Sequence, residues 1–178
     1  SKQKYSGDCS FQVDNEVLNW FTADKQTGTQ SNVTSLSLGN EGSSYSYKFF
    51  GDFTPTESAT YFFKTASDDG SWVFVNGELV VDNSGGHGIV TQTGSIDLVG
   101  GSQNEIVIVY GQGVGDASLE FQWYGGSTVT GYTGILNEFF AFTGCISCGS
   151  GETTESTGST SAGQCICNVG YFLDGSSC

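Results

Sequence analysis

Between residues 43 and 124, apolar and polar residues alternate with the two-residue period that is typical of half-buried β-strands. Tyr45, Tyr47 and Phe49, for example, fall on one face of such a strand. The segments that carry the pattern are 45–49, 61–63, 72–75, 79–81, 106–110 and 119–123. Asn76-Gly77 predicts a two-residue hairpin, because both positions can take the positive φ that this turn requires. The spacing predicts an all-β chain folded as an antiparallel β-sandwich or barrel.

The two ends of the chain lack this alternation. Residues 15–21 fit either one short helical turn or a strand, and Pro55 marks a connection between strands. From residue 144 onward the aromatic strand residues stop, and Ser, Thr, Gly and Cys dominate. A segment this small buries little apolar surface, so covalent links substitute for a core. We therefore expect a main domain at residues 1–144 and a cysteine-rich segment at 145–178.

Length and charge narrow the range of functions. With 178 residues, the chain has room for one main core and a small appendage. Five Lys and Arg stand against 19 Asp and Glu, and the net charge of -14 repels nucleic-acid phosphates and anionic lipids. This balance argues against a nucleic-acid partner and permits hard cations such as Ca²⁺, which oxygen ligands bind. The sequence has one histidine, His87, which removes most catalytic-triad, general-base and metal-hydrolase schemes.

The cysteines indicate an oxidising compartment. The chain has six, and all but Cys9 lie between 145 and 178, a pattern that favours disulfides. The Cys145-x2-Cys148 spacing also suits zinc, but Cys165 and Cys167 are too close for the usual zinc knuckle.

Secretion is supported by a glycosylation sequon that predicts a modified Asn32. The longest apolar strand candidate, 106–110, is far shorter than the roughly 18 residues that cross a bilayer. We expect a secreted or cell-surface protein with no membrane insertion within this fragment.

The adjacent acids Asp68 and Asp69 are the first candidates for chemistry. Neighbouring side chains of an extended strand point to opposite faces, so both carboxylates meet one ion only if the peptide between them is distorted, for example by a cis bond. The alternative is a solvated hairpin turn, because Asp69-Gly70 is a common turn dipeptide. Further along, Gly113 and Gly115 would let a loop turn its carbonyls inward, or would simply form a flexible connection.

The segments around these acids resemble the anthrax protective-antigen-type family, the PA14 domains. The resemblance rests on Ser-Asp-Asp-Gly-Ser at 67–71, an aromatic strand at 72–75, Val-Val-Asp-Asn at 80–83, Gly-Gly-His-Gly at 85–88 and a strand-loop-strand at 106–119. It spans roughly residues 10–143. It implies a β-sandwich and, in the lectin branch that includes yeast flocculins and bacterial adhesins, a calcium site.

In those lectins the aspartates, joined by a cis peptide, hold one Ca²⁺ that sugar hydroxyls then bind directly. Carried over, the calcium ligands are the carboxylates of Asp68 and Asp69, the amide of Gln112, and the main-chain oxygens of Val114 and Asp116. The sugar would contact Asp68, Asp69, Gln112, Gly115 and Asp116. Because Ca²⁺ takes 6 to 8 oxygens, this set leaves positions open for hydroxyls or water. Flocculins have Asn in place of Gln112 and an aromatic residue in place of Asp116, so calcium affinity and sugar specificity are expected to differ.

The tail resembles the C-terminal half of an epidermal-growth-factor-like (EGF-like) module, with Cys-x-Cys, a Gly-aromatic pair and a final Cys. That resemblance implies the disulfides Cys148–Cys165 and Cys167–Cys178, with Cys9–Cys145 as the remaining pair. Six cysteines allow 15 pairings, so the sequence alone leaves the connectivity open.

The expected function is a calcium-dependent carbohydrate-binding module of an adhesion protein, with glycans on cell surfaces or extracellular matrix as partners. The alternative is a structural or protein-interaction module that binds no sugar. We expect no enzymatic activity, because the carboxylates of a glycosidase stand roughly 5 to 9 Å apart across the scissile bond, and adjacent acids on one ion do not. Fusion to an enzyme outside this fragment stays open.

Other conspicuous residues are expected to be structural. His87 would pack or hydrogen-bond beneath the site, and Asp82-Asn83 would cap a turn. Because each lies within a strand pattern, Trp72, Tyr110 and Trp123 are expected in the core.

Overall fold

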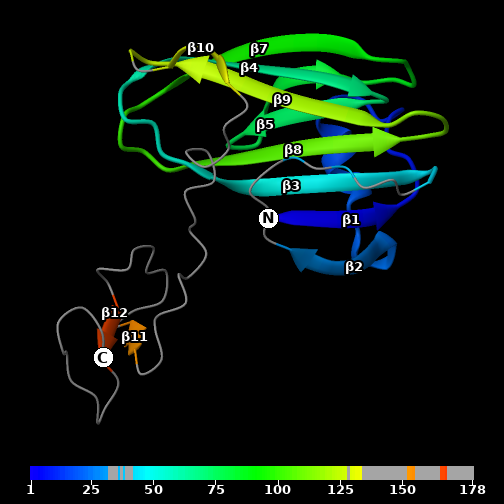
Figure 1. Cartoon of the computed structure of the whole chain (residues 1–178), viewed down its shortest axis with the longest axis horizontal. Coiled ribbons are helices and arrows are strands. Elements are labelled where there is room, and N and C mark those ends of the chain that lie inside the picture. The colour runs from blue at the N-terminus through cyan, green and yellow to red at the C-terminus, as the bar shows by residue number, and fades with distance from the viewer. Residues whose placement is uncertain are drawn as a thin grey trace.

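Two antiparallel sheets face each other in the computed structural model, which describes residues 1–31, 36, 38, 42–127, 129–133, 152–154 and 165–167 (Figure 1). This architecture confirms the predicted all-β sandwich. A separate two-stranded piece pairs β11 (Glu152–Thr154) with β12 (Cys165–Cys167).

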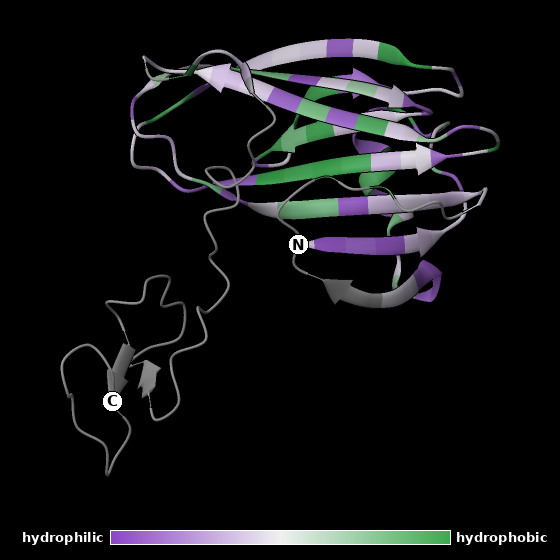
Figure 2. Ribbon diagram, viewed as in Figure 1, coloured by the Kyte–Doolittle hydropathy of each residue, from purple (hydrophilic) through white to green (hydrophobic). Residues whose placement is uncertain are grey.

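The larger sheet has six strands in the order β2-β1-β3-β8-β5-β6. Their bounds are β1 Lys2–Ser6, β2 Gln26–Ser31, β3 Tyr45–Phe53, β5 Ser71–Val75, β6 Glu78–Asn83 and β8 Asn104–Gln112. The strand β8, one of the two in the middle of this sheet, is apolar through most of its length (Figure 2), because both of its faces are covered by side chains.

The smaller sheet has four strands in the order β10-β9-β4-β7. Their bounds are β4 Ala59–Asp68, β7 Val90–Leu98, β9 Ser118–Gly125 and β10 Val129–Thr133. Gly94 of β7 lies against the β6 backbone so closely that a β-carbon there would sit 1.7 Å from the Val80 carbonyl oxygen. This contact brings one edge of the small sheet onto the large one.

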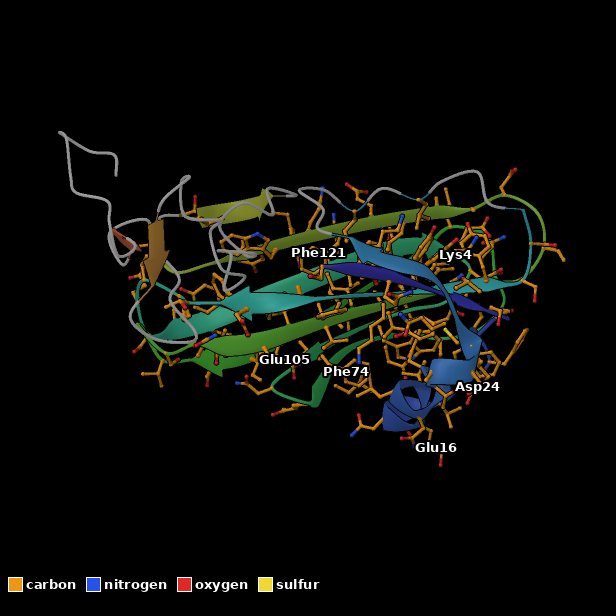
Figure 3. All side chains as sticks on the ribbon, turned by 90° about the horizontal axis from the view of Figure 1, so that it is seen from below. Lys4, Glu16, Asp24, Phe74, Glu105 and Phe121 are labelled. Carbon is orange, nitrogen blue, oxygen red and sulfur yellow. The ribbon has the colours of Figure 1, made fainter. Side chains whose placement is uncertain are left out.

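The main core fills the space between the sheets. The alternating faces predicted from sequence point into it, including those of Tyr47, Phe49 and Trp123. Aromatic rings pack edge-to-face or tilted across strands, as Phe53 does with Tyr61 and Trp123 at 5.3 and 5.5 Å between centroids. Figure 3 shows Phe121, another member of this core, on the side of the large sheet opposite to Glu16.

A second apolar cluster lies on the outer face of the large sheet, under the 3₁₀ helix η1 (Asp14–Trp20). A further 3₁₀ helix, η2 (Ala23–Lys25), follows and has no buried residue. Val17 of η1 is buried there with Trp72 and Phe74 of β5 and with Cys9. Residues 15–20 of the segment that the sequence left open are therefore helical. Trp72 belongs to this outer cluster rather than to the space between the sheets.

The Asn76-Gly77 hairpin is confirmed, since both residues have positive φ, 52° and 79°, between β5 and β6. Four strands of the two sheets were not predicted from the pattern: β1 and β2 near the N-terminus, β7 and β10. Their residues are largely polar, and most of β7 is exposed on the sheet surface. None of the helices in the described residues is long and apolar enough to cross a membrane.

The predicted Cys9–Cys145 disulfide is not formed at Cys9, which is a buried free thiol. Its side chain has no exposed surface because η1 covers it, and burial raises its pKa to about 12. Cys145, Cys148, Cys178 and Asn32 lie outside the described residues, so the other disulfides, the EGF-like tail and the glycosylation stay predictions.

Candidate functional site

The Asp68-Asp69 pair lies where β4 ends and β5 begins, and the peptide bond between the two residues is cis. Hydroxyl and amide groups support this turn from below. Ser71 Oγ donates to Thr65 Oγ1 at 2.9 Å and lies 2.7 Å from Ser67 Oγ. Asn83 Nδ2 donates to Ser67 Oγ at 2.9 Å. Because such a buried polar network is rigid when its members are paired, the turn has a fixed base.

Asp69 is the residue on which the surrounding segments converge. Its side chain is only 8% exposed, although it is a carboxylate. Oδ1 accepts a hydrogen bond from the backbone N–H of His87 at 2.9 Å, and Oδ2 accepts one from that of Gly113 at 2.8 Å. The carboxylate therefore holds the loop after β6 and the loop after β8 against the turn.

The electrostatic environment of Asp68 is that of a cluster of acids. Its pKa is raised, first by desolvation and then by the negative charges of Asp69 and Asp116, while His87 lowers it. The predicted ligands Asp69 and Asp116 are thus each close enough to Asp68 to repel its negative charge. A bound cation would relieve that repulsion.

Gln112, the last residue of β8, is fully buried and joins the same site. Its Nε2 donates to the Asp116 carbonyl at 2.9 Å, and its Oε1 lies 2.7 Å from the Tyr110 hydroxyl. That hydroxyl also lies 2.5 Å from the Asp68 carbonyl, yet it has one proton to donate to these two acceptors.

Turning the Gln112 amide over, which exchanges two groups of nearly equal shape, resolves this conflict. Nε2 then donates to Tyr110, and Tyr110 donates to the Asp68 carbonyl. The turned amide aims its oxygen at the Asp116 carbonyl, and two oxygens in that position would be stabilised by a cation between them. Only with the amide turned in this way would Gln112 and Asp116 offer the two oxygens of the suggested calcium ligand set, because the structure directs Gln112 Nε2 at the Asp116 carbonyl.

An N-terminal segment that the sequence did not associate with the site holds it from one side. Ser10 Oγ donates to Asp8 Oδ1 at 2.5 Å and accepts from the Gly70 N–H at 3.3 Å, while the Ser10 carbonyl accepts from the Gly85 N–H at 2.7 Å. A β-carbon on Gly113 would lie 3.0 Å from Asp8 Oδ2 and 3.3 Å from Asp69 Oδ2. Asp8 is thus a further carboxylate beside the pair.

The remaining site predictions have clear positions. The His87 ring contacts the carbonyls of Gly88 and Asn83 at 2.8 and 3.2 Å, in agreement with a structural role. Asp82 caps the turn after β6 by accepting from the Ser84 N–H at 2.9 Å. Val114 projects from the loop with 80% of its surface exposed, and the next residue, Gly115, has φ of 102°.

A profile of the PA14 domain family matches residues 2–135. The chain belongs to the PA14 domain family. The match covers the two facing sheets and all of the residues that surround Asp69. No curated protein sequence matches the chain significantly.

Solved structures show the same fold as this PA14 domain at low sequence identity. An anti-sigma factor domain-containing protein superposes with a TM-score of 0.58 at 22% identity, over 75% of this chain and 44% of that one. Another, from Clostridium clariflavum, gives 0.55 at 18% identity over the same shares. The epithelial adhesin 6 A domain of Candida glabrata gives 0.56 at 13% identity, over 78% of this chain and 84% of that one. The chain thus spans less than half of the first two proteins.

The donors that this PA14 domain offers are oxygens. Within the described ranges, no group of three or more His, Cys, Asp or Glu side chains is arranged to hold a metal. A site here would therefore combine the carboxylates of Asp68 and Asp69 with amide and main-chain oxygens. Such a mixed oxygen set suits a hard cation like Ca²⁺ rather than zinc.

Proposed function

We propose that this PA14 domain is a calcium-dependent carbohydrate-binding module of a secreted or cell-surface adhesion protein. Asp68, Asp69, Gln112 and the carbonyls of Val114 and Asp116 would hold the ion. The observation that carries the proposal is the buried Asp69 carboxylate, which is oriented by two backbone N–H groups beside a second carboxylate across a cis peptide. When bound, Ca²⁺ supplies coordination positions that exchange water for the hydroxyls of a sugar.

The protein's own residues supply orientation rather than reaction. His87 and Gly113 fix both oxygens of Asp69 through their N–H groups, so the carboxylate loses little freedom on binding an ion. The Tyr110 hydroxyl fixes the Asp68 backbone by donating a hydrogen bond to its carbonyl. The pair shares one turn, which is unlike the separated acids of a hydrolase, and we propose no catalytic role for it.

Glycans as partners are supported by the family and by one structural neighbour. The Candida glabrata adhesin domain, which shares this fold, was solved in complex with Galb1-3GlcNAc. The net charge of -14 agrees with a cation-binding module and disfavours acidic ligands. A shallow site of this kind would bind single sugars weakly, and many copies on a surface would raise the avidity.

The test is glycan-array binding of the purified chain in calcium and after chelation. We expect a glycan signal that chelator removes and calcium restores, and that Asp69→Asn abolishes. Glu57→Gln is the matched control, because Glu57 is also a carboxylate that accepts a backbone N–H, from Ser127, between the far ends of β3 and β4. A glycan signal indifferent to chelator and to Asp69→Asn would reject the proposal. Calcium binding with no signal on any glycan would favour the protein-interaction alternative.

A further inference from the structure

Exposed apolar side chains gather around the candidate site. Single apolar residues on a surface are ordinary, but a group of them beside a binding site calls for a reason. In the described chain, the large hydrophobic residues with high exposure are Phe11, Val13, Ile89, Val90, Val99, Val114 and Tyr132. Val99 follows β7 at the opposite end of the sandwich. Phe11, Ile89 and Val114 instead lie on the segments that surround Asp69.

Phe11 is the aromatic member of this group and the one whose position is best defined. Its side chain is 74% exposed, so it contributes little to the core. A β-carbon on Gly86 would lie 2.8 Å from Phe11 Cζ and 3.7 Å from Asp69 Oδ1. The ring therefore lies over Gly86, and the absent side chain at that position leaves the ring edge close to the Asp69 carboxylate.

The backbone presents Phe11 rigidly. The residue lies in a turn closed by the Gln12 N–H and the Cys9 carbonyl at 2.9 Å. Cys9 and Ser10, directly before it, have no exposed surface. Ser10 is also bonded to Gly70 and Gly85, which flank the site on two sides. A ring held this way pays little conformational entropy when a ligand packs on it.

We propose that Phe11 forms the apolar wall of the sugar site and packs against the C–H face of a neutral hexopyranose whose hydroxyls face Asp68 and Asp69. This assignment rests on the proposed carbohydrate function and adds a specificity residue to it. The chemistry matches, because a pyranose presents hydroxyls at its rim and C–H groups on its faces. An aromatic ring suits the face, and the acids with their cation suit the hydroxyls.

The charge around the ring restricts the ligand further. Asp8, Asp68, Asp69 and Asp116 contribute carboxylates around the site. A sugar acid would bring another negative charge among them, which like-charge repulsion opposes. The carboxylates therefore select for neutral sugars, and the wall at Phe11 selects for sugars with an uninterrupted C–H face.

The experiment titrates the methyl glycosides of galactose, glucose, mannose and fucose into the calcium-loaded chain by calorimetry. For the glycoside that binds most tightly, we expect Phe11→Ala to weaken binding about tenfold. Phe11→Tyr, which keeps the ring, should stay within about twofold of the parent. Terbium luminescence should give the same cation affinity for the parent and both variants, because Phe11 supplies no oxygen ligand. Methyl glucuronide should bind at least about tenfold more weakly than the best neutral glycoside.

Tyr132→Ala is the matched control, since Tyr132 is an aromatic residue with 40% exposure on β10, which pairs with the far end of β9. Its sugar affinity should equal that of the parent. Phe11→Ala with parental sugar affinity, or methyl glucuronide binding as tightly as the best neutral glycoside, would overturn the inference. If Asp69→Asn still abolished binding in either case, the calcium-dependent function would survive without the wall. Binding of none of the four neutral glycosides by the parent would overturn the inference, while a calcium-dependent signal on the glycan array would still support the carbohydrate function.

Discussion

Each end of the sandwich has a carboxylate that accepts hydrogen bonds from backbone N–H groups. At one end, Asp69 accepts them from the loops after β6 and β8. At the other end, Glu57 accepts one from Ser127 and so links the β3–β4 and β9–β10 connections. Their settings differ. Glu57 is half-buried, and the hydrogen bonds that it accepts from Ser127 lower its pKa. Asp69 is buried, and the pKa of its neighbour Asp68 is raised by desolvation and by surrounding acids.

This difference separates a structural carboxylate from one that is suited to bind a ligand. A carboxylate whose charge is favoured by its hydrogen bonds stabilises the fold around it. A carboxylate whose charge is disfavoured by neighbouring acids, as that of Asp68 is, would be stabilised by a bound cation. The end that carries Asp68, Asp69 and Asp116 is of the second kind, so changes there should affect binding more than changes at the far end.

The largest difference in stability should come from adding one methyl group at each end. A β-carbon on Gly111 would lie 2.7 Å from both N and Oγ of Ser10, whereas Gly101 at the far end has nothing within 4 Å but a φ of 76°. We expect Gly111→Ala to cost about 3 kcal/mol through overpacking, and Gly101→Ala about 1 kcal/mol through backbone strain. Urea unfolding measures both, and equal losses would contradict the tight packing of the N-terminal segment at the site.

A smaller effect is expected from removing one hydroxyl at each end. Ser10→Ala deletes the buried link between Asp8 and Gly70, and should cost about 1 to 2 kcal/mol and weaken calcium binding. Ser58→Ala removes an exposed acceptor of the Gly100 N–H and should change stability by less than about 0.5 kcal/mol. Unfolding curves and calcium titrations would show whether the two ends differ in this way. Unchanged calcium affinity in Ser10→Ala would show that Ser10 does not help to position the calcium ligands.

The Glu57 carboxyl should have a small, pH-dependent effect. Its pKa is lowered from 4.5 in the folded chain, so ionised Glu57 stabilises the fold at neutral pH. That contribution is lost as the pH falls below about 4.5 and through the lowered folded-state value. Urea midpoints of the parent and Glu57→Gln should therefore differ more at pH 7 than at pH 3. A difference that grows on acidification would have the wrong sign.

The smallest effect should be the chemical modification of Cys9, which directly precedes Ser10 in the N-terminal segment at the site. With no exposed surface and a pKa raised to about 12, its thiol is neutral and covered at pH 8. Iodoacetamide should leave Cys9 unmodified in the folded chain and label it after denaturation, as read by peptide mass spectrometry. Labelling of Cys9 in the folded chain would show that this segment opens readily.

Much of the sandwich could be predicted from the sequence, because alternation reports which face of a strand is buried. The strand from Tyr45 and the hairpin at Asn76-Gly77 followed from that pattern and from turn chemistry. The strand β7 did not, because its exposed polar residues carry no apolar period. Trp72 is buried as predicted, but a strand pattern does not tell which of two apolar clusters a side chain enters.

The site was predictable where residues adjacent in sequence act together, and not where distant segments meet. The resemblance to a known family singled out Asp68 and Asp69, and the cis bond between them agrees with it. No sequence signal joined Asp8, Ser10 or Phe11 to the site, because their contacts with Gly70, Gly86 and Gly113 cross 60 residues or more. An Asp-x-Ser turn is too common to indicate such a contact.

The central claim is that the acids at one end of the sandwich bind a cation. Calorimetric titration of CaCl₂ into the chelator-treated chain and into its Asp69→Asn variant tests it most directly. The account predicts about one ion per chain, bound by the parent at least about 100-fold more tightly than by Asp69→Asn, while Glu57→Gln matches the parent. Equal calcium affinity of the parent and Asp69→Asn, or no binding at millimolar calcium, would contradict it.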